Sequence, residues 1–400
     1  MATLAPTAHL QLPFFDAAHQ QLAADLSVWA AKQQVDEQDD RQACREWVRR
    51  LGQAGWLRHC VPAAFGGARA QLDSRTLVIL RETLAFYSPL ADFAFAMQGL
   101  GSGAITLAGT AAQKSRYLPA VAGGELIAAF ALSEEQAGSD AGAMSTSATL
   151  GPSGTVTLHG SKTWISNGGM ADYYCVFAKT DAQAGTRGIT AFIVDAATPG
   201  LDASEHIAVM APHPLATLHF DQCQLPADAQ LGELHGGFKL AMRTLDIFRA
   251  SVAAAALGMA RRALALAVDY AQARPMFGQR LADFQLTQAK LGEMVALVDA
   301  GAMLTYRAAW LRDCVGTEGA QQARDYTAAA AMAKMVATEN AQRVIDMALQ
   351  MHGGMGVRVG SKIESLYRDI RALRIYEGAT EVQLLILGKS LLRAASSPTQ

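Results

Sequence analysis

The spacing of the apolar residues changes twice along this 400-residue chain. From about residue 14 to residue 123 they recur at helical spacing. Between about Leu126 and Leu231, short runs such as Thr155–His159 alternate apolar and polar residues, and Gly, Asp, Asn and Pro separate these runs, as in strands joined by turns. From about Gly236 onward the helical period returns in long segments. This order of helices, strands and helices predicts an α+β protein with more than one domain.

The length of the chain supports the same division, because 400 residues exceed the usual size of one domain. We predict an N-terminal α-helical domain over 1–125, a middle β-sandwich or barrel-like domain over 126–235, and a C-terminal four-helix-bundle domain over 236–400. Two runs of four alanines, Ala253–Ala256 and Ala328–Ala331, would let helix backbones approach closely, which is typical of a tightly packed bundle.

The composition argues against several classes of function. A net charge of −2 gives no basic footprint for nucleic acid. The five cysteines form no CxxC pair, and they and the nine histidines form no Cys/His cluster, so we expect neither a disulfide framework nor a bound metal. Residues 1–15 contain no Lys or Arg and no signal-like apolar run, and we find no stretch of about 18 apolar residues without charge. We therefore expect a cytoplasmic protein without a membrane anchor.

A loop of small and hydroxyl residues, Ser133–Asp140, follows a strand-like run. Gly138 permits close approach of a ligand to the backbone, and Ser133 and Ser139 can donate hydrogen bonds to carbonyl or phosphate oxygens. A solvated polar loop would explain the same residues, so the loop alone predicts no particular ligand.

A second segment contains Trp164 and Ser166, just after a predicted strand. An indole can pack flat against an aromatic ring system, and in an extended chain a hydroxyl two positions later points to the same side. The alternative is that Trp164 is an ordinary core residue.

One carboxylate near the C-terminus, Glu377, lies in a mostly apolar run beside Gly378. Burial raises the pKa of a carboxylate and makes it a stronger base, as removal of a weakly acidic C–H proton requires. The alternative is a carboxylate that stabilises the N-terminus of a helix beginning near Thr380.

Together, these three segments resemble the acyl-CoA dehydrogenase family, and the resemblance covers nearly the whole chain. It implies FAD as cofactor and a role in fatty acid metabolism. In the family, the Ser133 position bonds the pyrimidine edge of the flavin and the Ser166 position lies near flavin N5. The full set of implied FAD contacts within one subunit is Phe130, Leu132, Ser133, Ser139, Trp164, Ser166 and Thr380.

The same resemblance implies that a neighbouring subunit completes the FAD site. The implied contacts are Arg274, Phe277, Gln285, Gln350, Gly353 and Gly354. The chain is therefore expected to form a homo-oligomer, by analogy a tetramer. An electron-transfer flavoprotein is implied as partner.

By resemblance, Glu377 takes the α-proton of an acyl thioester while the β-hydrogen leaves as hydride to flavin N5, which gives a trans-2-enoyl thioester. Ser139, Asp246, Arg249 and Gly378 are the implied substrate contacts. A second family arrangement has the base at the position of Phe248, which cannot accept a proton, so we favour Glu377.

Two alternatives remain open from the sequence. Leu384 replaces a frequent family Arg, which is compatible with a dehydrogenase of an acyl group tethered to a carrier protein. A non-catalytic FAD-binding assembly protein is the other alternative, although such a protein need not retain a carboxylate at residue 377.

Overall fold

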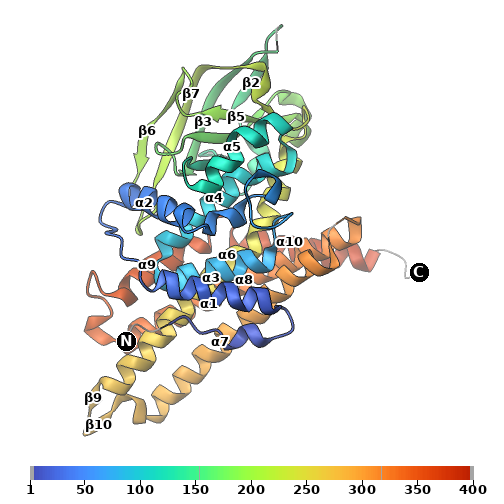
Figure 1. Ribbon diagram of the computed structural model, residues 1–400. Helices are drawn as coiled ribbons and strands as arrows, with labels where there is room; N and C mark the ends of the chain where they lie inside the picture. The colour runs from blue at the N-terminus through green and yellow to red at the C-terminus, as the bar shows by residue number, and fades with distance from the viewer. Residues whose placement is uncertain (1–3, 153, 317, 397–400) are drawn as a thin grey trace. The chain divides into compact units, whose positions relative to one another are not determined.

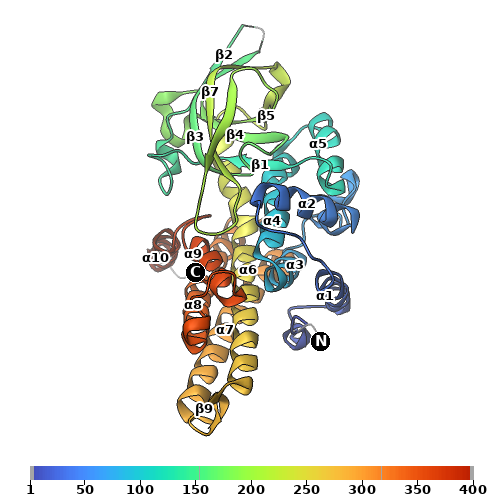
Figure 2. The same cartoon turned by 90° about the vertical axis from the view of Figure 1, so that its left-hand side faces the viewer.

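The computed structural model describes residues 4–152, 154–316 and 318–396. The chain divides into two compact units. The helical unit contains the N-terminal residues up to Gln34, then Asp73–Asp92, and then the chain from Arg249 onward. The sheet unit contains Val35–Leu72 and Phe93–Phe248. Figures 1 and 2 show that helices dominate the first unit and that the long strands belong to the second.

The sheet unit is built on one hydrogen-bonded sheet with the strand order β6-β7-β3-β2-β4-β5-β8, in which β1 also pairs with β4 in parallel. The strands are β1 (Ala128–Ala131), β2 (Ser147–Leu150), β3 (Val156–Ser166), β4 (Tyr173–Lys179), β5 (Ile189–Asp195), β6 (Leu201–Ile207), β7 (Leu215–Leu225) and β8 (Gln230–Leu231). The apolar run in β4 is buried on both faces, whereas β6 at the edge is largely exposed. The predicted middle β domain is therefore confirmed.

Two helices of the sheet unit hold the strand ends in place. Arg41 of α2 (Asp40–Gln53) donates to the carbonyl oxygens of Gly168 and Leu215, each at 2.7 Å. The side chain of Gln98, on α4 (Pro89–Ala108), bonds to the backbone on both sides of the start of β1, with its Oε1 atom 2.9 Å from the Ala128 nitrogen. A third helix, α5, spans Ala111–Gly123. These contacts fix the position from which the loop after β1 departs.

The helical unit contains α1 (Ala17–Ala30), α3 (Ser74–Tyr87), most of α6 (Gly237–Ala273), α7 (Gln285–Trp310), α8 (Ala320–Met351), α9 (Lys362–Leu373) and α10 (Thr380–Ser396). A short hairpin, β9 (Pro275–Met276) and β10 (Gln279–Arg280), joins α6 to α7. Alanines of α6 and α8 fill much of the core, including the run Ala253–Ala256. The backbones approach so closely that a Cβ on Gly258 would lie 2.1 Å from the Glu82 carbonyl oxygen. This packing confirms a C-terminal helical bundle.

The remaining helical turns are short: η1 (Ala8–Gln11), η2 (Trp56–Cys60), η3 (Ala63–Phe65), η4 (Ala141–Ala143), η5 (Ala182–Gly188), η6 (Ala227–Ala229), η7 (Leu281–Asp283), the π-helical turn η8 (Leu311–Val315) and η9 (Gly353–Met355). Within the described ranges, α6 is the one helix long and apolar enough to cross a membrane, but 67% of its most apolar window is buried inside the protein.

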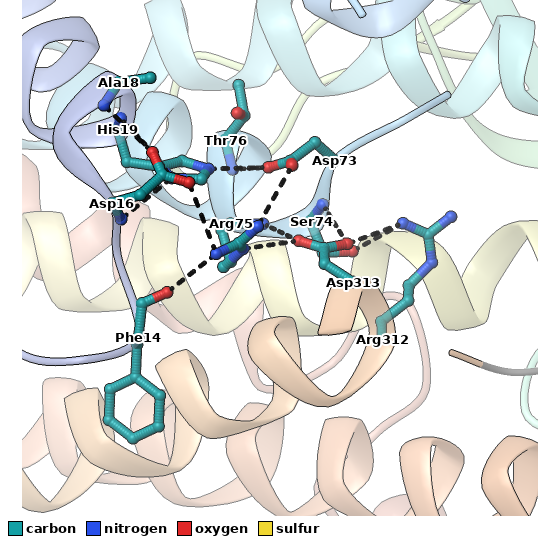
Figure 3. Close-up of polar contacts among 10 residues, drawn as sticks. All are labelled: Phe14, Asp16, Ala18, His19, Asp73, Ser74, Arg75, Thr76, Arg312 and Asp313. Atoms are coloured by element: carbon teal, nitrogen blue, oxygen red, sulfur yellow. Dashed lines mark hydrogen bonds and ion pairs between the residues drawn. The ribbon is translucent and has the colours of Figure 1, made fainter. Parts of the chain in front are cut away.

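A polar cluster anchors the N-terminus of α3 (Figure 3). The two carboxylate oxygens of Asp313, from η8, accept hydrogen bonds from the backbone nitrogens of Ser74 and Arg75 at 2.9 and 2.8 Å. The buried His19 of α1 contacts Asp73, the N-cap residue of α3, at 3.1 Å. Helix α3, which carries Arg81, is thus held at its N-terminus by charge-assisted hydrogen bonds.

Candidate functional site

Glu377 lies in the turn between α9 and α10. Its backbone φ is +52°, a left-handed conformation that is unfavourable for Glu, and the next residue, Gly378, has a φ of +93°. The side chain is partly buried, and its Oε2 atom is enclosed by protein without a hydrogen-bond partner. A strained backbone and an unsatisfied buried carboxylate together are typical of a functional site.

Two buried side chains hold this turn. Lys334 of α8 donates from Nζ to the Gly378 carbonyl oxygen at 2.7 Å. Gln383 of α10 donates from Nε2 to the same oxygen at 2.9 Å and to the Glu377 carbonyl oxygen at 3.4 Å. Both side chains are completely inaccessible to solvent. The left-handed backbone therefore persists because the surrounding helices fix its carbonyl groups.

The surroundings of Glu377 make its carboxylate a stronger base. Burial raises its pKa above the usual range, and the positive charges of Arg81, Lys334 and Arg249 oppose this rise without cancelling it. Burial also lowers the pKa of Lys334 to about 8, although the Glu377 carboxylate opposes that change. A carboxylate with a raised pKa is suited to accept a proton from a weak carbon acid near neutral pH.

A buried ion pair lies next to this base. Arg81 of α3 forms a bidentate pair with Asp92 of α4, with Nε–Oδ1 and Nη2–Oδ2 distances of 2.8 and 2.9 Å. The Nη1 atom of Arg81 donates to Ser251 Oγ at 3.1 Å, and Arg81 also forms a side-chain hydrogen bond with Tyr376, the residue before Glu377. None of these contacts was expected from the sequence, because Asp92 lies on another helix and Ser251 and Tyr376 lie far from Arg81 along the chain.

Thr380 is the first residue of α10, and its hydroxyl donates to Glu339 Oε1 at 2.6 Å. Arg374 donates to the same oxygen at 2.8 Å. The hydroxyl proton of Thr380 is therefore engaged within the chain, so a contact with FAD, which stays a prediction, would use its oxygen lone pairs or its methyl group.

In the sheet unit, a buried pair pins the loop that begins at Ser133. The Glu134 carboxylate lies 2.8 Å from Lys162 Nζ and accepts hydrogen bonds from the backbone nitrogens of Ser145 and Thr146. Burial would raise the pKa of Glu134, but the Lys162 ammonium and these hydrogen bonds lower it to about 2. No role was predicted for this pair. A lysine in the middle of an alternating strand was the signal that could have pointed to it.

Trp164 is 56% exposed, which excludes the alternative that it is a core residue. It lies in β3 at a register shift between Lys162 and Ile165, and its φ is +59°. The register shift lies before Ile165, and Ile165 is buried between the exposed Trp164 and the partly buried Ser166, so the side chains still alternate here. That Trp164 and Ser166 face one ring system stays a prediction. The indole lies at the surface of the sheet unit.

Ser166 is partly buried, and its Oγ lies 3.0 Å from Nε2 of His213, a residue that the sequence did not single out. Burial lowers the pKa of His213 to about 4, so its imidazole is neutral at physiological pH. The His213 ring packs on Phe93 with the ring centroids 4.0 Å apart. The hydroxyl of Ser166 is thus already oriented by a neutral partner within the sheet unit.

The other predicted contacts of the sheet unit differ in exposure. Gly138 and Ser139 are exposed in the loop after β1, and a Cβ on Gly138 would meet nothing within 4 Å. The Leu132 side chain is buried, so its backbone is what a ligand could reach. Phe130 is partly buried with its ring centroid 4.9 Å from that of Phe177. Asp246, on α6, is partly buried.

The residues expected to serve a neighbouring subunit lie at the surface of the helical unit. The exposed set is Arg274, Phe277, Gln285, Gln350, Gly353 and Gly354. Phe277 is 89% exposed at the tip of the β9–β10 hairpin. The rings of Tyr270 and His352 stack with their centroids 4.4 Å apart, so the segment that follows α6 and the end of α8 lie at the same end of the bundle.

These features fit a planar, phosphate-bearing cofactor such as FAD. The sheet unit presents an exposed indole and an unobstructed glycine, Gly138. The helical unit presents an exposed Phe277 close in sequence to the exposed Arg274, whose guanidinium suits a phosphate. Within the described ranges, no group of three or more His, Cys, Asp and Glu side chains is placed to hold a metal ion.

Comparison with known proteins identifies relatives over most of the chain. Family models match in three parts: the acyl-CoA dehydrogenase N-terminal domain over residues 14–125, the middle domain over 129–223 and the C-terminal domain over 235–392. The short-chain-specific acyl-CoA dehydrogenase of Megasphaera elsdenii is 43% identical over 287 residues, which are 71% of this chain and 73% of that protein. The CarC subunit of the caffeyl-CoA reductase–Etf complex of Acetobacterium woodii is 35% identical over 352 residues, or 87% of this chain and 90% of that protein.

Solved structures give the same result. Butyryl-CoA dehydrogenase from Megasphaera elsdenii matches with a TM-score of 0.88 and 35% identity, covering 95% of this chain and 99% of that chain. An acyl-CoA dehydrogenase from Bacillus anthracis complexed with FAD matches with a TM-score of 0.88 and 30% identity, covering 95% of this chain and 68% of that chain. The three-part architecture predicted from the sequence is confirmed by these matches.

Proposed function

The chain belongs to the acyl-CoA dehydrogenase family, and we propose that Glu377 is the base that takes the α-proton of its substrate. The protein is an FAD-dependent oxidoreductase that dehydrogenates acyl-CoA thioesters. The observation that carries the assignment of the base is the enclosed Oε2 atom of Glu377, which has no partner in the described chain and belongs to a carboxylate with a raised pKa. The two alternatives raised by the sequence are not favoured by these relatives.

The step that we assign to Glu377 is proton abstraction from a carbon next to a thioester carbonyl. In water a carboxylate is too weak a base for this step, whereas a desolvated carboxylate is closer in strength to the carbon acid. The clamp of Lys334 and Gln383 on the Gly378 carbonyl fixes the direction of the Glu377 side chain, so that orientation contributes to the rate. FAD, when bound, supplies the acceptor for the hydride that leaves the β-carbon.

We assign the FAD contacts of the sheet unit to Ser133, Trp164 and Ser166, and we retain Phe130, Leu132 and Ser139 as neighbours. This assignment is supported by the exposure of the Trp164 indole and by the orientation that His213 imposes on Ser166. We also retain the prediction that Ser139, Asp246, Arg249 and Gly378 contact the substrate.

We further propose that the protein works as a homo-oligomer, by analogy a tetramer, in which the exposed Arg274 and Phe277 of one subunit reach the FAD of another. Support comes from the exposure of Arg274 and Phe277, which lie three residues apart at the β9–β10 hairpin, with Phe277 89% exposed. An electron-transfer flavoprotein is the proposed electron acceptor, in line with the Etf complex named for the relative from Acetobacterium woodii. A cytoplasmic location is supported by the five cysteines, because no disulfide joins any of them within the described residues.

The test of the base is Glu377→Gln, which preserves the size of the side chain and removes its basicity. The variant should retain FAD and bind butyryl-CoA, yet fail to bleach the flavin absorbance when the two are mixed without oxygen. Glu381→Gln is the matched control, since Glu381 is an exposed carboxylate in the first turn of α10. Bleaching of the Glu377→Gln variant at the rate of the control would overturn the assignment.

A further inference from the structure

The ion pair between Arg81 and Asp92 has no role in the function described so far. The side chains of Arg81 and Asp92 are 2% and 3% exposed, and they are joined by two parallel hydrogen bonds. Taking two charges out of water is unfavourable, and an apolar pair of similar volume would be as stable or more stable in many cores. A buried pair of this kind, placed beside a functional carboxylate, therefore points to a role other than stability.

The charges that act most strongly on Glu377 come from four helices. Arg81 approaches from α3, Asp92 from α4, Arg249 from α6 and Lys334 from α8. Arg81 lowers the pKa of Glu377 and Asp92 raises it, so the two partners act on the base in opposite directions. The hydroxyl of Tyr376 is a further titratable group beside Arg81.

We propose that Arg81 and Asp92 are positioning residues that set how strongly Glu377 holds a proton. Asp92 neutralises Arg81, so that the arginine can fix Tyr376 and the start of the catalytic turn without turning Glu377 into a weak base. This inference rests on the proposed role of Glu377, and it concerns the charged residues that act on its carboxylate.

The structure gives the sign of each perturbation. With Asp92 made neutral, the full charge of Arg81 acts on Glu377, which then holds its proton less tightly and is a weaker base. With Arg81 made neutral, Asp92 is left as an uncompensated neighbour and Glu377 holds its proton more tightly. A charge within about 4–6 Å shifts a carboxylate pKa by about 1 unit or more. Replacing both partners by apolar residues should therefore return Glu377 close to its original behaviour.

The experiment uses the FAD-loaded enzyme and three variants: Asp92→Asn, Arg81→Met and the double variant Arg81→Met/Asp92→Leu. Proton abstraction is isolated by following exchange of the α-hydrogen into D2O, with an acyl-CoA analogue that has no hydrogen on its β-carbon. The acidic limb of this exchange should move to lower pH in Asp92→Asn, with a slower plateau, and to higher pH in Arg81→Met, by about 1 unit or more in each case. In the double variant, the acidic limb should differ from that of the parent enzyme by no more than about half of the shift seen in either single variant.

A second measurement is independent of turnover. The protonated-carboxyl infrared band that disappears in Glu377→Gln identifies Glu377, and its titration without substrate should move in the same directions. Glu82→Gln is the matched control, because Glu82 is the next residue on α3 and forms a buried pair with Arg261, yet it is not among the charges facing Glu377. Its pH profile should stay unchanged.

The outcomes separate the inference from the function on which it rests. If Asp92→Asn and Arg81→Met shift the limb in the same direction, or if neither shifts it, the inference is wrong even when Glu377→Gln abolishes exchange. If Glu377→Gln itself retains exchange, the proposed base is wrong. If Arg81→Met fails to fold, the other two variants still test the inference. The acidic limb should move to lower pH in Asp92→Asn and should return toward the parent position in the double variant.

Discussion

Replacing Lys334 by Met tests the clamp on the catalytic turn. Methionine matches the length of the lysine stem but removes the charge and the donor that bonds the Gly378 carbonyl at 2.7 Å. The carbonyl keeps its second hydrogen bond, from Gln383 at 2.9 Å. We therefore expect the turn to keep its shape on average and the base to lose one of its three positive neighbours.

The expected change in stability follows from two opposing contributions. The pKa of Lys334 is lowered from 10.5 to about 8, so the folded state disfavours its charged form by about 3 kcal/mol at pH 7, and Met removes this penalty. Loss of a charge-assisted hydrogen bond costs about 1.5–3 kcal/mol. These contributions nearly cancel, so the free energy of unfolding should change by no more than about 1–2 kcal/mol at pH 7.

The sign of the pH dependence adds a second expectation. Because the folded pKa lies below the unfolded value, the penalty on Lys334 is complete below about pH 8 and disappears as the pH rises to 10.5. The parent enzyme should therefore gain stability between these values, and Lys334→Met should lack that gain. Urea unfolding at several pH values measures the stability of the parent enzyme and of Lys334→Met.

The activity should respond differently: without the lysine charge the pKa of Glu377 rises, and the acidic limb of flavin bleaching moves to higher pH. A loss above about 4 kcal/mol with an unmoved limb would refute this reasoning.

Three further predictions concern other parts of the chain. Trp164→Ala should change the free energy of unfolding by under about 1 kcal/mol, because the indole is 56% exposed, yet weaken FAD binding at least about tenfold in a fluorescence titration. Glu134→Gln should lose about 3–5 kcal/mol in urea unfolding, because it leaves a buried ammonium without its carboxylate. In the parent, the stability due to Glu134 is present above pH 4.5 and lost as the pH falls toward its folded pKa of about 2. Gly258→Ala should destabilise by about 1–3 kcal/mol or more, because its Cβ would overlap a carbonyl of α3, whereas Gly388→Ala, on the open face of α10, should be neutral or stabilising by up to about 1 kcal/mol.

The sequence by itself determined the order of the structural elements. Helical and strand periods differ, so the change of period near Leu126 and its return near Gly236 mark where helices give way to the sheet and return. Local composition also singled out Glu377 as a carboxylate in a mostly apolar run that a glycine follows. These features depend on neighbours in the chain, which a sequence displays directly.

Only the tertiary structure decided what surrounds the site residues. Arg81 lies almost 300 residues before Glu377 on α3, and Lys334 lies on α8, so no periodicity reveals that both act on one carboxylate. His213, which precedes β7, meets Ser166 at the end of β3, and a register shift between Lys162 and Ile165 accompanies the exposure of Trp164. The strength of a buried base depends on charges within a few ångströms of it, and packing, not sequence distance, brings those charges together.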